Sequence, residues 1–137
     1  MNKQEKYDRT YLKMALEWSK LSHCVRKKVG AIIVKNGMIV SDGYNGMPSG
    51  LNNCCETNDE TNWNVIHAEA NAILKCARHG QSCDGSTLYQ THSPCKDCSK
   101  LILQSGIKRL VYIEDYKDLS GIEFLRAAGI EINRIDV

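Results

Sequence analysis

Two short motifs set the strongest demand on the fold of this chain: His67-Ala68-Glu69, and the segment 94–98 with the sequence Pro-Cys-Lys-Asp-Cys, whose first metal-binding side chains lie 28 residues apart. One imidazole and two thiols spaced C-x-x-C are ligands that tetrahedral zinc prefers, and three protein ligands leave one position open. An open position is typical of a catalytic zinc, which lowers the pKa of a bound water. The fold must therefore bring two distant segments to one metal ion.

The position of Glu69 predicts an acid and base beside that metal. One nitrogen and two sulfurs already supply the protein's ligands, so this carboxylate is free to transfer protons. Residues two apart on a helix do not share a face, so His67 and Glu69 can converge only beyond the N-terminal end of a helix. Pro94 suits the first position of a second helix and Ser93 its cap. We therefore predict two helix N-termini directed at one metal; a structural zinc is the alternative interpretation.

Length and composition favour one globular domain over residues 1–137. No apolar run approaches the roughly 20 residues that span a membrane. The polar N-terminus lacks the apolar core of a signal peptide. The seven cysteines are an odd number without an export signal. We therefore expect reduced thiols and metal sites rather than a disulfide framework, and a cytoplasmic protein that does not contact membranes.

The charge of the chain is unevenly distributed. The net charge is +2, but residues 1–30 carry eight Lys or Arg against three Asp or Glu. A basic segment can bind nucleic acid. The aromatic residues that stack single-stranded bases do not alternate with these charges. We therefore favour a solvated helix followed by a local phosphate pocket, and consider a nucleic-acid partner the weaker interpretation.

Periodicity predicts alternating helices and strands. Residues 8–21 form the first expected helix, with Tyr11, Met14, Ala15 and Trp18 facing the core. The Asn36-Gly37 pair is a strong hairpin signal between two β-rich runs. The other expected helices are 65–78, 94–104 and 120–128, and the expected strands are 29–35, 38–43, 86–90, 109–113 and 130–135. Residues 44–64 are expected to be a loop. This order predicts an α/β fold with a mixed sheet and helices on both faces.

Four segments occur in an order typical of one family. They are Val29–Val34 (VGAIIV), Gly43–Gly50 (GYNGMPSG), His67–Ile73 (HAEANAI) and Pro94–Cys98 (PCKDC). Together they resemble the deoxycytidylate (dCMP) deaminases of bacteria and phages, in the cytidine deaminase superfamily. The H-x-E and P-C-x-x-C motifs belong to all zinc-dependent nucleobase deaminases, whereas the GYNGMP segment distinguishes this family. The resemblance spans nearly the whole chain and implies a three-layer α/β/α fold with a five-stranded sheet, forming a single zinc-dependent nucleotide deaminase domain.

The activity that this resemblance implies is hydrolysis of dCMP to dUMP and ammonia, which supplies dUMP for thymidylate synthesis. Glu69 would be the catalytic acid and base, with His67, Cys95 and Cys98 as ligands of a Zn²⁺ ion. Similar enzymes usually form homohexamers, and many are activated by dCTP and inhibited by dTTP, bound with Mg²⁺. The effector-binding residues implied in this way are Lys28, Asn45, Gly46, Met47 and Pro48.

The resemblance also implies a set of substrate contacts. The expected residues are Arg26, Asn45, Ala68, Ser93 and Tyr116. The fork of the Arg26 guanidinium suits a phosphate dianion, with Lys27 and Lys28 as alternative phosphate contacts. The deoxyribose would bind Asn45, and the backbone at Ala68 and around Ser93 and Pro94 would read the base edge.

Three further cysteines could bind a second metal. Some similar phage enzymes hold a structural zinc with cysteines at the places of Cys24, Cys54 and Cys55, and His23 is a candidate fourth ligand. A tetrahedral site needs four ligands, and the sequence gives no convincing full set. We expect Cys76 and the remaining cysteine, at position 83, to be ordinary thiols.

Two other functions stay open at this point. A deaminase acting on tRNA, single-stranded nucleic acid or another nucleobase would use the same zinc motifs, and the basic N-terminal segment suits it, but the GYNGMP segment argues against it. A non-catalytic zinc module that binds dCTP or dTTP would have no use for the carboxylate of Glu69.

Overall fold

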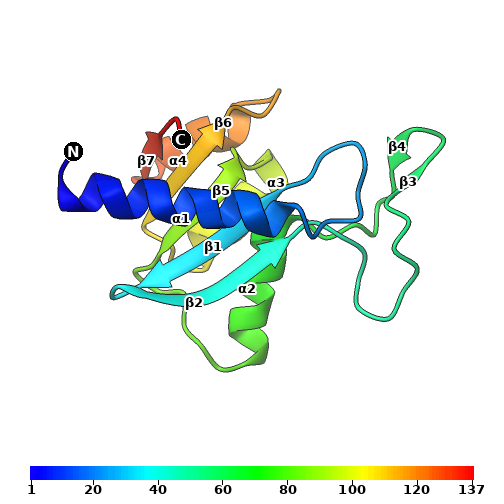
Figure 1. Cartoon of the computed structure of the whole chain (residues 1–137), viewed down its shortest axis with the longest axis horizontal. Coiled ribbons are helices and arrows are strands. Elements are labelled where there is room, and N and C mark those ends of the chain that lie inside the picture. The colour runs from blue at the N-terminus through cyan, green and yellow to red at the C-terminus, as the bar shows by residue number, and fades with distance from the viewer.

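The structure, a computed structural model, describes residues 1–137 as a five-stranded mixed sheet with helices on both faces (Figure 1). The helices are α1 (Lys3–Ser19), α2 (Ala68–Arg78), α3 (Lys96–Gln104) and α4 (Ser120–Ala127). The strands are β1 (Gly30–Lys35), β2 (Met38–Tyr44), β3 (Glu56–Thr57), β4 (Glu60–Thr61), β5 (Thr87–His92), β6 (Arg109–Glu114) and β7 (Glu131–Arg134). None of the helices is both long and apolar enough to cross a membrane.

The sheet has the strand order β2-β1-β5-β6-β7. Strand β1 is antiparallel to both β2 and β5, whereas β5, β6 and β7 are parallel. The predicted hairpin is confirmed: Asn36 and Gly37 both have positive φ, 52° and 74°, as a tight turn between twisted strands requires. The parallel strands are joined through α3 and α4, which is the usual crossover arrangement.

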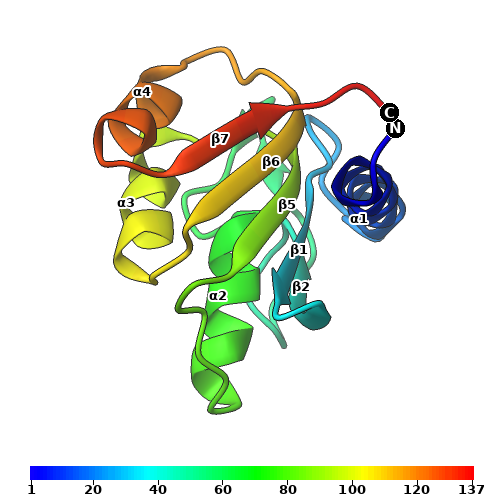
Figure 2. The ribbon, with the colours of Figure 1, turned by 90° about the vertical axis from the view of Figure 1, so that its left-hand side faces the viewer.

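The helices divide between the two faces of the sheet (Figure 2). The helices α2, α3 and α4 cover one face and enclose the larger apolar core, while α1 lies alone on the other face. A smaller core that includes Leu12, Ala15 and Ile32 lies under α1. The predicted three-layer α/β/α fold is therefore confirmed.

The buried face of α1 is shifted from the predicted one. Leu12 and Ala15 are fully buried, whereas Met14 is 38% exposed. The buried face also includes Asp8 and Ser19, which a search for apolar periodicity does not count. The prediction that Met14 faces the core is therefore wrong, because polar residues form part of the true interface.

Asp8 fixes this polar interface between α1 and the sheet. Its two carboxylate oxygens accept hydrogen bonds from Arg109 Nη1 at 2.9 Å and Nη2 at 2.7 Å, and Oδ1 also accepts one from Tyr89 at 2.6 Å. Burial raises the pKa of Asp8, but the hydrogen bonds from Arg109 and Tyr89 outweigh it and hold the pKa below the usual value. A paired charge thus replaces apolar contact at this point of the helix.

Several predicted boundaries differ from the structure by a few residues. Helix α2 begins at Ala68 rather than at residue 65, and α3 begins at Lys96 rather than at residue 94. Cys95, not Ser93, is the cap of α3, and its Sγ accepts a hydrogen bond from the backbone N–H of Cys98. The predicted 44–64 loop contains the two-residue strands β3 and β4, which project away from the main sheet (Figure 1).

Candidate active site

The beginnings of α2 and α3 meet at one end of the sheet. His67 is the cap of α2 and Cys95 the cap of α3, which directly follows the carboxyl end of the central strand β5. Ligands of open α/β sheets usually bind at this end of the strands. A glycine allows the close approach of α2: a Cβ on Gly43 would lie 2.5 Å from the carbonyl oxygen of Ala68. The N-terminal ends of α2 and α3 are therefore directed at the same place, as predicted.

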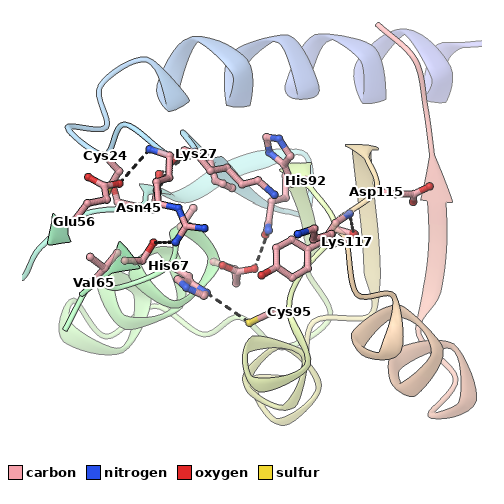
Figure 3. A pocket seen from close by; sticks show the side chains of 18 residues that line it. Cys24, Lys27, Asn45, Glu56, Val65, His67, His92, Cys95, Asp115 and Lys117 are labelled. Atoms are coloured by element: carbon pink, nitrogen blue, oxygen red, sulfur yellow. Dashed lines mark hydrogen bonds between the residues drawn. The ribbon is translucent and has the colours of Figure 1, made fainter. Parts of the chain in front are cut away.

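The three predicted metal ligands lie together. His67 Nδ1 lies 3.5 Å from Cys95 Sγ and 3.3 Å from Cys98 Sγ (Figure 3). Zinc–nitrogen and zinc–sulfur bonds at tetrahedral angles require about 3.6 Å between such atoms. These residues therefore fit one zinc ion, and no fourth cysteine, histidine or carboxylate joins the group.

The two thiols of this group differ in acidity. A hydrogen bond from Cys98 is the main cause that lowers the pKa of Cys95 to about 4, against the opposing effect of burial. The same hydrogen bond and burial raise the pKa of Cys98. Of the two thiols, Cys95 is therefore the one that ionises more readily.

Glu69 lies in the first turn of α2 and is only 2% exposed. Burial raises its pKa, although a hydrogen bond from Gln90 Nε2 to Glu69 Oε2, 2.7 Å long, partly offsets that effect. A raised pKa favours the protonated carboxyl group, which is the form that can donate a proton. Glu69 therefore has the properties of a general acid and base.

A cavity of about 560 Å³ opens over these groups. This volume falls within the usual range of small-ligand sites. Figure 3 shows Cys24, Glu56 and Val65 on one side of the view and His92, Asp115 and Lys117 on the other. The cavity therefore lies between the loops that follow α1 and β6, and two of the candidate metal ligands, His67 and Cys95, also line it.

All five predicted substrate-binding residues line this cavity: Arg26, Asn45, Ala68, Ser93 and Tyr116. The exposed Arg26 guanidinium donates a hydrogen bond to Thr61 Oγ1 at 3.3 Å. The ring of Tyr116 has the ammonium group of Lys27 over it, 4.4 Å from the centroid. The ammonium group of Lys27 and the ring of Tyr116 are thus in contact at the wall of the cavity.

Asn45 differs from the other four because its amide is already bonded within the chain. Its Oδ1 accepts a hydrogen bond from the backbone N–H of Val29, and its Nδ2 donates one to the carbonyl oxygen of Lys27, both at 2.8 Å. This side chain fixes the loop that carries the basic residues. A direct contact between Asn45 and deoxyribose would have to replace one of these bonds.

The predicted effector residues lie just before β1 and just after β2. Only Asn45 of that set lines the cavity. Gly46 pairs with Ile66 through two backbone hydrogen bonds of 3.0 and 2.8 Å. Lys28 donates a hydrogen bond to the carbonyl oxygen of Ser22, and Met47 and the proline after it lie in the loop beyond.

The expectation of reduced cysteines is wrong for two residues. Cys24 and Cys55 form a disulfide that joins the loop after α1 to the loop before β3. In this form neither sulfur is a thiolate, so a second zinc at Cys24, Cys54 and Cys55 would need the reduced form. Cys54 is exposed and lies outside the group of potential ligands formed by Cys24, Cys55 and Glu56. Cys76 and the thiol at position 83 are free and buried, as predicted.

The cavity also has lining residues that the sequence analysis did not assign to the site, among them Gln90, His92 and Lys117. His92 lies 3.2 Å from Glu114, and burial is the main cause that lowers its pKa. Gln90 did carry a signal, because an amide within the buried strand sequence TLYQTH is unusual unless it has a partner. Lys117 lies in an irregular loop, where sequence patterns indicate little about direction.

Comparisons with known proteins agree with this geometry. The family model for the cytidine and deoxycytidylate deaminase zinc-binding region matches residues 5–114. The deoxycytidylate deaminase of Enterobacteria phage T4 is 41% identical, over 90% of this chain and 86% of that protein. ComE operon protein 2 of Bacillus subtilis is 40% identical, over 85% of this chain and 64% of that protein.

A solved structure also matches the fold of this chain along nearly its whole length. The dCMP deaminase from the cyanophage S-TIM5, crystallised with dCMP and dUMP, superposes with a TM-score of 0.92. Its sequence is 47% identical, and the match covers 98% of this chain and 99% of that one. A structure from a study of tRNA:A34 deaminases matches with a TM-score of 0.60 at 20% identity, which is a likeness of fold alone.

Proposed function

This chain belongs to the cytidine and deoxycytidylate deaminase family and is a deaminase, and from that premise we propose that it hydrolyses dCMP to dUMP and ammonia. The observation that carries this proposal is the gathering of His67, Cys95 and Cys98 beside the buried carboxyl group of Glu69. The dCMP and dUMP bound by the cyanophage enzyme support the choice of substrate. The whole chain, residues 1–137, would act as a single deaminase domain that supplies dUMP for thymidylate synthesis.

The metal-binding residues account for the chemistry that the site needs. His67, Cys95 and Cys98 would hold a zinc ion, whose contribution when bound is to lower the pKa of a water molecule. Two thiolates and a neutral imidazole would balance the charge of Zn²⁺. The site has three such side chains rather than four, which is the number typical of catalytic zinc.

Glu69 would move the protons. It would take a proton from the attacking water and deliver it to N3 of the cytosine ring as the water oxygen bonds to C4. It would then take the second proton from that oxygen and deliver it to the amine, so that the C4–N bond breaks, ammonia leaves and the C4 carbonyl forms. Each transfer needs a carboxyl group whose pKa lies closer to neutrality than that of an exposed glutamate, and burial of Glu69 raises its pKa in that direction.

The rest of the cavity would bind the nucleotide. The backbone at Ala68 and Ser93 is suited to read the base edge, because both residues are buried at the base of the cavity. The cations Arg26, Lys27 and Lys117 would attract the 5′-phosphate, since no other cationic side chains line the cavity apart from its histidines. The ring of Tyr116 would cover the substrate.

A substrate panel tests this proposal. Purified protein is incubated with dCMP, CMP, deoxycytidine and a tRNA anticodon stem, and loss of the cytosine absorbance or inosine formation is followed. We expect dCMP to have the highest kcat/KM and the tRNA stem to remain unchanged. Turnover of RNA without turnover of dCMP would contradict the proposed substrate class. Zinc-loaded protein that binds dCMP but never deaminates it would support a non-catalytic module instead.

Regulation and assembly are further proposals that rest on the family resemblance. Activation by dCTP and inhibition by dTTP, each with Mg²⁺, would involve the GYNGMP segment and the contacts of a homohexamer. Adding each triphosphate to the dCMP assay tests the regulation, and light scattering tests the assembly. A second zinc would require reduction of the Cys24–Cys55 bond, after which both sulfurs and the Glu56 carboxylate would be available within 4.8 Å of one another.

A further inference from the structure

Gln90 occupies an unusual place for an amide. It lies in β5, the middle strand of the five, and pairs with Ala31 on one side and Tyr112 on the other. Directly paired residues share one face of a sheet, and these two neighbours belong to the larger core beneath α2, α3 and α4. Gln90 is 2% exposed. Its side chain therefore stands on the core side of the sheet, where apolar residues are the rule.

Only half of this amide is satisfied. Nε2 donates a hydrogen bond to Glu69 Oε2 at 2.7 Å, whereas Oε1 is buried at the lining of the cavity and has no partner among the protein's own atoms. A buried acceptor without a donor destabilises the folded state, and leucine or methionine of similar size would avoid that cost. Stability alone therefore does not explain glutamine at this position. The single hydrogen bond that Gln90 makes is to the one carboxyl group proposed to move protons.

We propose that Gln90 is a positioning residue that fixes the orientation of the Glu69 carboxyl group for proton transfer. This inference rests on the proposed function. The side chain of Gln90 is on the central strand of the sheet, which is hydrogen-bonded to a strand on each side and so fixes its position. Glu69 lies in the first turn of α2. With Oε2 held by Gln90, the carboxyl group turns its other oxygen to exchange protons and cannot rotate freely.

The first test is a split between kcat and KM in Gln90→Leu. Leucine keeps the volume and removes the hydrogen bond. Misplacing a reacting group by about 1 Å can cost about 10²-fold in rate, so we expect kcat for dCMP to fall about 10- to 100-fold with KM changed less than about threefold. Zinc content and melting temperature should remain close to those of the wild type. Unchanged kcat would overturn the proposal.

Ser41→Ala is the matched control. Ser41 Oγ donates a buried 2.7 Å hydrogen bond to the carbonyl oxygen of Ala72, in the same helix that carries Glu69. Loss of that bond should lower the melting temperature yet leave kcat within about twofold. If instead Gln90→Leu and Ser41→Ala lose stability and kcat in the same proportion, Gln90 is merely structural and the proposal fails.

A double-mutant cycle separates action through Glu69 from an independent role. In a Glu69→Gln background, adding Gln90→Leu should lower kcat by less than about twofold, because the group that Gln90 orients is already absent. A further loss as large as that in the wild-type background would contradict the proposal. Crystal structures add a readout without turnover: Glu69 should occupy one rotamer in the wild type and several in Gln90→Leu, and a single unchanged rotamer would overturn the inference.

The same experiments distinguish the two proposals. A wild-type protein that fails to deaminate dCMP contradicts the proposed function, and the rotamers of Glu69 still decide the role of Gln90. A wild-type protein that deaminates dCMP, with Gln90→Leu equally fast, contradicts only the role of Gln90.

Discussion

At the scale of single residues, Glu69 is the side chain on which the proposed deamination depends most. Glu69→Gln keeps the size and the hydrogen-bonding capacity of the side chain but cannot accept and return a proton. We expect this variant to bind zinc and fold normally while kcat for dCMP falls by about 10² to 10⁴. Steady-state kinetics with metal analysis checks this, and near-normal turnover would remove Glu69 from the mechanism.

Arg26 is the residue whose role is tested by comparing two substrates. Arg26→Ala removes an exposed guanidinium at the cavity, so we expect kcat/KM for dCMP to fall by at least about tenfold and that for deoxycytidine to change little. Lys6→Ala, the same loss of charge on the exposed side of α1, serves as the control. Equal losses on both substrates would show that Arg26 does not bind the phosphate.

Protons compete with zinc at His67, Cys95 and Cys98. The hydrogen bond to Cys95 raises the pKa of His67 above its ordinary 6.5, so acid protonates this ligand and weakens metal binding. Cys98, with its raised pKa, must lose a proton even at neutral pH. We expect zinc affinity to fall by about tenfold for each unit by which the pH is lowered, for each proton that zinc must displace. The fall should be steeper below the pKa of His67, because zinc must then displace a further proton. Competition with a chelating dye between pH 5 and 8.5 measures this, and a flat profile would contradict it.

Sequence reasoning reached some of these residues and missed others for a physical reason. Spacing predicts the proposed zinc ligands and Glu69, because metal chemistry restricts residue types. The structure brings Arg26, Ser93 and Tyr116 to the same cavity, although no regular spacing in the sequence links them. The internal bonds of Asn45 and the half-satisfied amide of Gln90 depend on which side chains meet across the fold, which no local pattern encodes.

At the scale of elements, the approach of β2 to α2 sets the position of the site. Gly43→Ala would place a Cβ 2.5 Å from the carbonyl oxygen of Ala68 and 2.8 Å from the backbone nitrogen of Ala72. The helix would have to move, so we expect a loss of about 1–3 kcal/mol in the free energy of unfolding together with reduced turnover. Chemical denaturation and the dCMP assay measure both.

Gly46→Ala is the control for this variant because nothing lies within 4 Å of its added Cβ and its φ is not in the left-handed region. We expect its free energy of unfolding to change by less than about 0.5 kcal/mol. If Gly43→Ala were as stable and active as the wild type, close packing of β2 on α2 would not position Glu69.

Elements with a strong periodic signal were predicted well, and those without one were not. The hairpin at Asn36-Gly37 and the helices after β5 and β6 agree with the structure to within a few residues. The hairpin of β3 and β4 has two residues in each strand, too few for a period. In α1, Met14 was wrongly assigned to the core, and the buried Asp8 was missed because it is held there by its ion pair with Arg109.

At the scale of the whole molecule, topology explains why the site lies where it does. Parallel β5 and β6 end at the same edge, so the loops after them and the helix caps converge there. The order of elements predicted this arrangement. The Cys24–Cys55 bond links two loops 31 residues apart in sequence, and counting cysteines gave no means to predict it.

The proposed deamination requires a zinc ion held by three side chains, with a fourth coordination position that no protein side chain occupies. The most direct measurement removes the metal with a strong chelator, then restores it, while dCMP deamination and zinc content are followed in the same samples. We expect about one tightly bound zinc per chain at this site, loss of turnover on removal, and recovery as zinc returns. Full activity in protein free of zinc, or a fourth protein side chain bound to the metal, would contradict the account.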